Sequence, residues 1–199
     1  MVEKRTLYLF DFDGTITKKD SLFHFLKFYA NPVQYFLGLI IFSPLFLLAK
    51  SNVLNKSKIK EMFISFFLKA EPQIKIEEIA NDYANEVEKI FRPKATEMLL
   101  EIKKDPFSDC YIVSASLDSW LKPIAKKNGV NLICTNALYQ NGFYTGKFSS
   151  INCNFKEKKN RILKEINIKK YNKIISFGDS KGDLEMFSIS DEIHFKPFR

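Results

Sequence analysis

The chain has 199 residues, 46% of them hydrophobic, which is enough for one globular core or for a core with a smaller insert. The chain has only seven glycines and seven prolines, a content that excludes collagen-like and low-complexity chains. The formal net charge of +8 favours an anionic partner, such as a phosphorylated substrate or an acidic membrane surface, although a solvated lysine surface is the simpler explanation of the charge alone. No nucleic-acid-binding module is recognisable, so we expect no nucleic-acid partner.

The three cysteines, Cys110, Cys134 and Cys153, form no CxxC spacing, and two of them lie in predicted buried strands. This usage predicts a reducing compartment without a disulfide framework. The charged stretch Met1–Thr6 lacks the features of a signal peptide. We therefore expect a cytoplasmic protein, either free or at the inner face of the membrane.

The first predicted element is a short buried strand, Leu7–Phe10, that leads into a loop with two carboxylates. Residues two apart in extended chain point the same way, so Asp11 and Asp13 can face one ligand at the carboxyl end of the strand. Gly14 permits a sharp turn and Thr15 adds a hydroxyl. Read in isolation, the same residues also fit a strand that ends in an ordinary acidic turn.

Helical patterns follow without strands. Asp20 precedes Ser21 as a helix N-cap, and the helix should end before Asn31–Pro32. The almost wholly apolar run Val33–Ala49 contains Pro44, which should kink or split a helix. Two more helices are predicted, over about Ser57–Lys69 and Ile76–Ile90.

The run Val33–Ala49 is marginal in length for a membrane span, which needs about 20 apolar residues. A single crossing would also separate Asp11 from the later site residues. We therefore predict a helix buried in a cap domain, with a helix that dips its apolar face into a membrane surface as the alternative.

A helix is predicted to begin at Arg92–Pro93. From Asp109 onward the chain alternates between strands and helices, with a hairpin turn at Asn141–Gly142. Alternation of this kind predicts an α/β fold with a parallel sheet covered on both faces. We expect a Rossmann-like three-layer core from residues 1–16 and 92–199, with an all-helical cap inserted at 17–91. The predicted elements of the second half are a helix from Arg92–Pro93, strand Cys110–Val113, helix Leu117–Lys127, strand Leu132–Cys134, the hairpin Ala137–Tyr139 and Phe143–Phe148, helix Lys156–Ile166, strand Lys173–Phe177, helix Asp183–Ile189 and strand Glu192–Phe195.

Three further motifs lie where predicted strands end or helices begin. Ser114 follows Tyr111–Val113, Lys158 lies near the start of a helix, and the loop Gly178–Asp183 follows a strand. Each has an ordinary structural explanation: a helix cap, a surface lysine or an acidic turn. Their joint occurrence in this order indicates a catalytic site.

The four motifs Asp11-Phe12-Asp13-Gly14-Thr15, Ser114, Lys158 and Gly178-Asp179-Ser180-Lys181-Gly182-Asp183 resemble those of the haloacid dehalogenase superfamily of phosphohydrolases. Ile112-Val113-Ser114-Ala115-Ser116, Asn152-Cys153 and Thr145-Gly146-Lys147 look like its phosphoserine-phosphatase-like branch. The resemblance covers the core, and it is specific for the superfamily but not for a substrate.

The resemblance implies a phosphomonoesterase in which Asp11 attacks phosphorus and becomes an aspartyl-phosphate, while Asp13 acts as general acid and base. Mg²⁺ would be held by the Asp11 carboxylate, the Asp13 backbone carbonyl and Asp179, with Asp183 in support. The phosphoryl group would be bound by Gly14, Thr15, Ser114, Ala115 and Lys158, with Lys156 and Lys159 as competitors for the role of the lysine.

The cap leaves the substrate open. Asp20 lies where phosphoserine phosphatases carry a substrate-contacting Glu, yet it is also a helix cap. The aromatic, apolar cap looks closer to phosphatidylglycerophosphatase relatives, so a membrane-surface lipid phosphatase is the alternative to an enzyme for small phosphorylated substrates. From other classes, a receiver domain and a catalytically inactive binding module are the competing interpretations.

Overall fold

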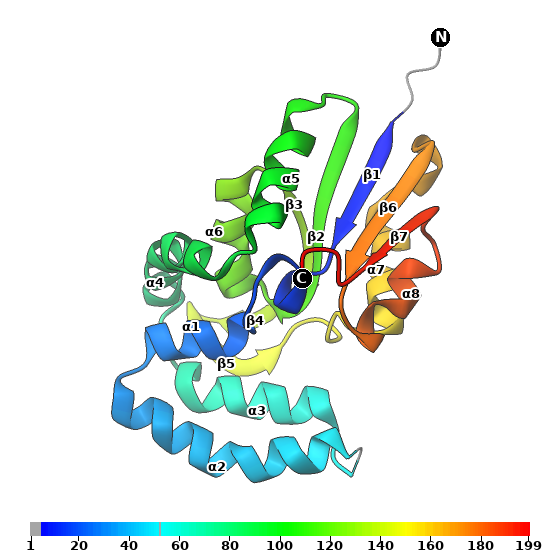
Figure 1. Cartoon of the computed structure of the whole chain (residues 1–199). Helices are drawn as coiled ribbons and strands as arrows, with labels where there is room; N and C mark the ends of the chain where they lie inside the picture. Colours follow the sequence, from blue (N-terminus) through cyan, green and yellow to red (C-terminus); the bar gives the residue numbers. More distant parts are fainter. Residues whose placement is uncertain (1–4, 52) are drawn as a thin grey trace.

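The computed structural model describes residues 5–51 and 53–199, and these ranges contain seven strands, eight α-helices and four shorter helical segments (Figure 1). The strands are β1 (Thr6–Phe10), β2 (Ser108–Leu117), β3 (Asn131–Thr135), β4 (Ala137–Gln140), β5 (Phe143–Phe148), β6 (Lys173–Gly178) and β7 (Glu192–Phe195). The helices are α1 (Ser21–Tyr29), α2 (Pro32–Lys50), α3 (Lys56–Leu68), α4 (Gln73–Glu86), α5 (Pro93–Lys104), α6 (Asp118–Asn128), α7 (Lys156–Glu165) and α8 (Leu184–Phe187).

Five strands form a parallel sheet in the order β3-β2-β1-β6-β7, with β1 at its centre. Phe10, the last residue of β1, pairs with Ile112 of β2 on one side and with Phe177 of β6 on the other. The loops after β1, β2 and β6 therefore leave the same edge of the sheet. This edge is where an open α/β sheet binds its ligands.

Alternating side chains of β1 cover both faces of the sheet. Phe10 belongs to the core on one face, which α5 and α6 cover through residues such as Leu99 and Trp120. Leu9 belongs to the core on the other face, under α7 and α8. A sheet buried on both faces by helices is the three-layer arrangement that the alternating sequence predicted, and it confirms the α/β fold class with a helical region.

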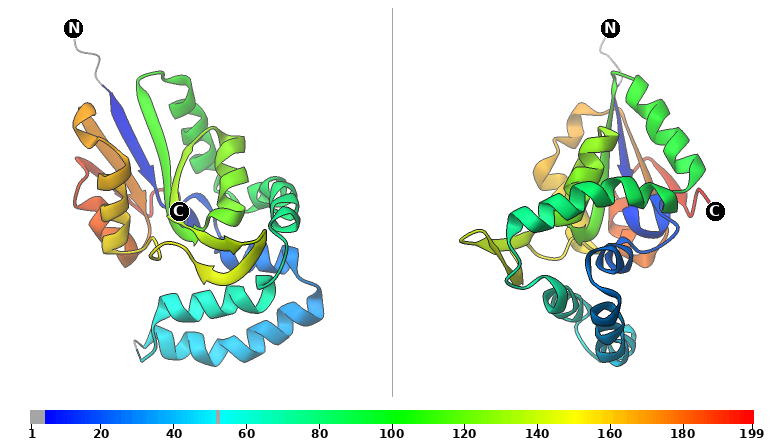
Figure 2. Two further views of the ribbon diagram at one scale, coloured as in Figure 1. Left: turned by 180° about the vertical axis from the view of Figure 1, so that it is seen from behind. Right: turned by 90° about the vertical axis from the view of Figure 1, so that its left-hand side faces the viewer.

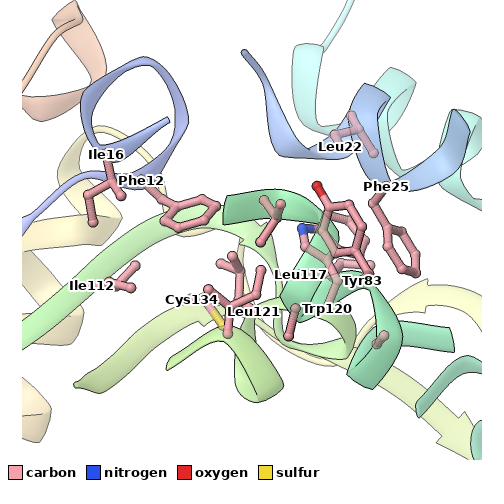
Figure 3. Close-up of a cluster of buried hydrophobic side chains, with 14 of the residues drawn as sticks. Phe12, Ile16, Leu22, Phe25, Tyr83, Ile112, Leu117, Trp120, Leu121 and Cys134 are labelled. Atoms are coloured by element: carbon pink, nitrogen blue, oxygen red, sulfur yellow. The ribbon is translucent and has the colours of Figure 1, made fainter. Parts of the chain in front are cut away.

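The helical segment α1–α4 is inserted between β1 and α5 and lies beyond the carboxyl edge of the sheet (Figure 1). The chain leaves and re-enters the core at adjacent positions: Thr17 pairs with Phe91, and the amide of Arg92 donates to the Ile16 carbonyl at 2.8 Å. In Figure 3 the apolar core continues from the sheet into this insert, where Phe25 of α1 stacks on Trp120 of α6 with ring centroids 5.0 Å apart. Burial of these rings fixes α1 against the core.

Helix α2 is continuous through Pro44, so the predicted split does not occur. Proline removes the amide that would bond to the Ile40 carbonyl, and the Ser43 hydroxyl donates to that carbonyl instead, at 3.4 Å. Within the described residues, α2 is one helix whose length and composition would allow a membrane crossing: it has 19 residues and a mean hydropathy of 1.8, and 22% of the stretch is buried. Its neighbour α3 packs along it, since Phe42 meets Phe63 edge to face at a centroid distance of 5.4 Å.

The antiparallel hairpin β4–β5 lies against α3, outside the main sheet (Figure 2). Its backbone bonds to the segment between α3 and α4: the Ala70 amide donates to the Tyr144 carbonyl at 2.8 Å, and the Gln73 amide donates to the Gly142 carbonyl at 2.7 Å. The sequence predicted the hairpin and its Asn141–Gly142 turn but not this partner. A segment that follows β3 of the core thus supports the insert.

Candidate active site

The turn after β1 brings its carboxylates to the carboxyl edge of the sheet. Asp11 is buried, and its Oδ2 accepts a hydrogen bond from the Thr15 hydroxyl at 3.2 Å. Gly14 has a φ of +85°, which favours glycine, and a Cβ there would lie 2.5 Å from Oδ2 of Asp179. Glycine at this position therefore lets the loop after β1 approach the loop after β6.

Lys158, in the first turn of α7, is buried between two carboxylates. Its Nζ donates to Oδ1 of Asp11 at 2.6 Å and to Oδ1 of Asp183 at 2.7 Å. The two competing lysines lie elsewhere: Lys156 is exposed, and Lys159 Nζ bonds to the Ser188 hydroxyl at 2.9 Å. Among the three candidates, the geometry therefore singles out Lys158 as the lysine beside Asp11.

Burial and charge act in opposite directions on this buried group of ions. Burial by itself would lower the pKa of Lys158, but the negative charges of Asp11 and Asp183 raise it above its ordinary value, so the lysine stays protonated. Burial raises the pKa of Asp11 to about 7 in the metal-free protein, against the opposing charge of Lys158. Additional positive charge beside Asp11, such as a bound cation, would therefore favour its ionised form.

The loop after β6 is organised by Asp183. Its Oδ2 accepts hydrogen bonds from the amides of Asp179 and Ser180, at 3.2 and 3.0 Å, and from the Ser180 hydroxyl at 2.9 Å. Burial would raise the pKa of Asp183, but Lys158 and these donors hold it below the usual range. Both oxygens of Asp183 are thus engaged, which suits a supporting residue.

Asp179 is the more accessible carboxylate of that loop. Its Oδ2 accepts a hydrogen bond from Nη2 of Arg199 at 2.5 Å, because the last residues of the chain return to the carboxyl edge of the sheet (Figure 1). Burial raises the pKa of Asp179, and the charge of Arg199 opposes this rise. Positive charge is therefore favoured at this point of the site.

Three carboxylates are close enough to share one cation. Asp11, Asp179 and Asp183 each offer an oxygen, and these atoms lie within 4.8 Å of one another. An all-oxygen donor set suits a hard divalent ion such as Mg²⁺. The Gly14 backbone leaves the space beside Asp179 that a Cβ would fill. The residues present thus fit the predicted magnesium site.

Asp13 points in another direction, toward the junction with the insert. Its Oδ1 accepts from the amide of Ser21, at the start of α1, at 2.6 Å, and its Oδ2 accepts from the Ser116 hydroxyl at 2.6 Å. The Ser116 amide in turn donates to the hydroxyl of Ser114 at 3.0 Å. This chain of bonds connects the predicted acid–base residue to the predicted phosphate-binding serine.

Lys60 reaches the site from the insert, and the sequence reasoning did not find it. Its half-buried side chain extends from α3, and Nζ donates to the Ala115 carbonyl at 2.9 Å. Burial lowers the pKa of Lys60, while the charges of Asp20 and Asp13 oppose this shift. The helical spacing could have indicated it, because Lys60 lies four and seven residues before Ile64 and Phe67 and so shares the inward face of α3 with them.

Asp20 lies in the insert, directly before α1. Its Oδ1 accepts from the Leu22 amide at 2.9 Å, which confirms the predicted cap of α1. Desolvation by the surrounding protein and the negative charge of Asp13 raise the pKa of Asp20 to about 6. Two cavities border Asp20, with volumes of about 560 and 320 Å³.

The family follows from sequence comparison. Residues 8–188 match the sequence model described as haloacid dehalogenase-like hydrolase. The chain belongs to this family. It is also 33% identical over 196 residues to Protein CicA of Caulobacter vibrioides, and the match covers 97% of this chain and 86% of that protein. These findings confirm the superfamily that the motifs indicated.

Solved structures show the same fold for this haloacid dehalogenase-like hydrolase. A protein of unknown function from Bordetella pertussis Tohama I superposes with a TM-score of 0.82 at 19% identity, covering 96% of this chain and 89% of that one. A phospho-aspartyl intermediate analogue of phosphoserine phosphatase superposes with a TM-score of 0.67 at 20% identity, covering 96% and 86%. The fold is thus similar to that of the branch indicated by the sequence.

Proposed function

We propose that the protein hydrolyses phosphate monoesters through an aspartyl-phosphate on Asp11. The observation that carries the proposal is the position of the Asp11 carboxylate, buried at the end of β1 with Lys158 Nζ 2.6 Å from Oδ1. The likeness in fold to a structure described as a phospho-aspartyl intermediate analogue supports it. Neither a receiver domain nor an inactive module explains the second carboxylate, Asp13, held two residues later toward the insert.

In the first step, a carboxylate oxygen of Asp11 attacks phosphorus, and the phosphorus–oxygen bond to the leaving alcohol breaks. Asp13 donates a proton to the leaving oxygen. In the second step, water attacks the phosphorus of the aspartyl-phosphate and loses a proton to Asp13, and inorganic phosphate leaves as the Asp11 carboxylate is regenerated. Proton transfer of this kind contributes about 10²–10⁴-fold to a rate.

The remaining residues hold the phosphoryl group and the cation. Lys158 and Ser114 would bind the phosphoryl oxygens as their charge changes, together with the turn Gly14–Thr15 and the backbone of Ala115. Mg²⁺ would be held by Asp11, Asp179 and the Asp13 backbone carbonyl, supported by Asp183, and when bound it would offset the repulsion between carboxylate and phosphate.

The substrate would enter beside Asp20, between the insert and the core, and small phosphorylated compounds are the first candidates. The smaller cavity beside Asp20, of about 320 Å³ and lined by residues of the insert, favours a second candidate, a phosphate ester with an apolar tail. Its walls combine Leu22, Phe23 and Phe46 with Lys60, so an apolar group and an anion would both find partners there. A lipid phosphate would reach this cavity most directly from a membrane against the insert.

The buried, unpaired thiols support a cytoplasmic location.

The test is turnover of p-nitrophenyl phosphate and of a panel of phosphorylated metabolites and lipids by the purified chain with Mg²⁺. Asp11→Asn should reduce turnover to background, while Asp82→Asn, an exposed carboxylate on α4, should retain it. Acid-quenched wild-type protein should gain the mass of one phosphoryl group, and the Asp11→Asn variant should not. Hydrolysis by Asp11→Asn at the wild-type rate would overturn the proposal.

A further inference from the structure

The outer face of α2 is apolar along its whole length. Several large apolar side chains of this helix are exposed, among them Val33 at 78%, Ile40 at 71% and Leu47 at 69%. Asn31–Ala49 contains no charged residue, whereas the outward face of a helix in a water-soluble protein is normally polar. Contiguous apolar surface of this extent marks an interaction site. We name it the α2 face; it consists of the exposed side chains of Val33, Phe36, Leu37, Ile40, Ile41, Leu47 and Leu48.

The opposite side of α2 is fixed to the protein. Its rings pack against α3, with Phe46 5.2 Å from Phe63 and Tyr35 6.4 Å from Phe67 between ring centroids. A Cβ at Gly38 would lie 2.4 Å from the ring of Phe67, so glycine allows the two helices to approach closely. Helix α2 is therefore held with its apolar face outward, as the outermost element of the insert in all three views (Figures 1 and 2).

The charges around the α2 face have one sign. Residues 21–60 contain five lysines and no aspartate or glutamate. One of them, Lys60, is turned inward to the Ala115 carbonyl, which leaves Lys27, Lys50, Lys56 and Lys58. Lysines flank α2 at both ends: Lys27 borders the same cavity as Tyr35, and Lys50 and Lys56 border the same cavity as Phe46. None of the five takes part in an ion pair within the parts of the chain that the structure describes.

We propose that the α2 face docks on the surface of an anionic lipid bilayer. An apolar helix face flanked by lysines matches the two attractions of such a surface, since the side chains enter the acyl boundary and the lysines approach the head groups. A second copy of the chain fits less well, because pairing two α2 faces would bring eight lysines together, Lys27, Lys50, Lys56 and Lys58 of each copy, without a carboxylate from either segment 21–60. The helix lies on the bilayer and does not cross it, because its inner side is packed on α3.

The docking proposal does not depend on the proposed reaction, and its test separates the two. The full-length chain is sedimented with vesicles of phosphatidylcholine alone and with vesicles that also contain phosphatidylglycerol. We expect binding to the anionic vesicles at about 0.1 M salt and weaker binding at about 0.5 M, where charges are screened more strongly. Binding to phosphatidylcholine alone should be weak.

The double variant Ile40→Gln/Leu47→Gln should bind at least about tenfold more weakly, because two exposed apolar side chains are lost from the docked surface. The matched control is Ile151→Gln/Leu184→Gln, which replaces two surface side chains outside the insert that are 71% and 58% exposed. It should bind like the wild type. Both variants should keep the wild-type thermal unfolding midpoint and any turnover of soluble p-nitrophenyl phosphate, which shows that the fold is intact.

Equal binding by the double variant and the wild type would overturn the proposal. Recovery of the wild type in the supernatant with anionic vesicles would also overturn it. If the wild type instead forms a dimer in solution that Ile40→Gln/Leu47→Gln dissociates, with no vesicle binding, a second copy covers the α2 face and the bilayer does not.

Discussion

Replacement of Lys158 by methionine should strongly destabilise the metal-free protein. The change removes the cation that lies 2.6 Å from Asp11 and 2.7 Å from Asp183, and both carboxylates stay buried without it. Breaking a buried ion pair by removing one partner typically costs about 3–5 kcal/mol. Methionine has a similar length and leaves little cavity, so the loss should report mainly on charge.

The assay is urea unfolding in EDTA, followed by the fluorescence of Trp120, the one tryptophan of the chain. With a slope of about 2 kcal/mol/M, the expected loss shifts the midpoint by roughly 1.5–2.5 M. The control is Lys156→Met, because Lys156 is exposed and its replacement should change stability by no more than about 0.5 kcal/mol.

The same two variants decide which lysine acts in turnover. Phosphatase activity should be lost in Lys158→Met and retained in Lys156→Met. A Lys158→Met variant as stable and as active as the wild type would refute the reasoning. An inactive Lys156→Met beside an active Lys158→Met would transfer the phosphate-binding role to Lys156.

Three further predictions concern the cation and the acid–base residue. Gly14→Ala should weaken Mg²⁺ binding about 10–100-fold in calorimetry, because its Cβ would lie 2.5 Å from Asp179. The control is Gly142→Ala, since Gly142 also has a positive φ, +79°, but no atom lies within 4 Å of the added Cβ. Equal loss of Mg²⁺ affinity in both variants would show that backbone strain alone is responsible. Removal of divalent ions by EDTA should abolish turnover and added Mg²⁺ should restore it, whereas turnover that persists in EDTA contradicts a cation role for the three carboxylates. Ser116→Ala should lower kcat about 10–100-fold with KM little changed, because the 2.6 Å hydrogen bond from the Ser116 hydroxyl that orients Asp13 is lost. An unchanged kcat would show that the Ser21 amide alone is enough to orient Asp13.

The sequence predicted the parts of the site that depend on local order. Leu7–Phe10 is apolar, and two acids follow it, so the end of a buried strand and its carboxylates could be read directly. Helix ends were equally local: Asp20 caps α1, and Gly129, with a φ of +68°, ends α6 as expected. The resemblance to the family indicates Lys158 as the phosphate-binding lysine, and the structure places Lys158 beside Asp11.

The parts that the sequence did not predict depend on contacts between distant segments. Ser116 lies 103 residues from the carboxylate that it orients, and Lys60 lies 55 residues from the carbonyl that it contacts. Strand β2 runs on to Leu117, beyond the predicted end at Val113, because Ser114 and Leu117 pair with residues of β3. No local pattern carries such pairings, since they arise when the sheet and the insert assemble.

The hairpin β4–β5 determines how the insert can open. Besides the two chain segments at Thr17 and Phe91, the insert is attached to the hairpin backbone through the amides of Ala70 and Gln73. An opening of the insert must carry the hairpin with it or break these backbone bonds, and it must also release the Lys60 ammonium from the Ala115 carbonyl. Movement of the insert is therefore coupled to movement of the segment that follows β3.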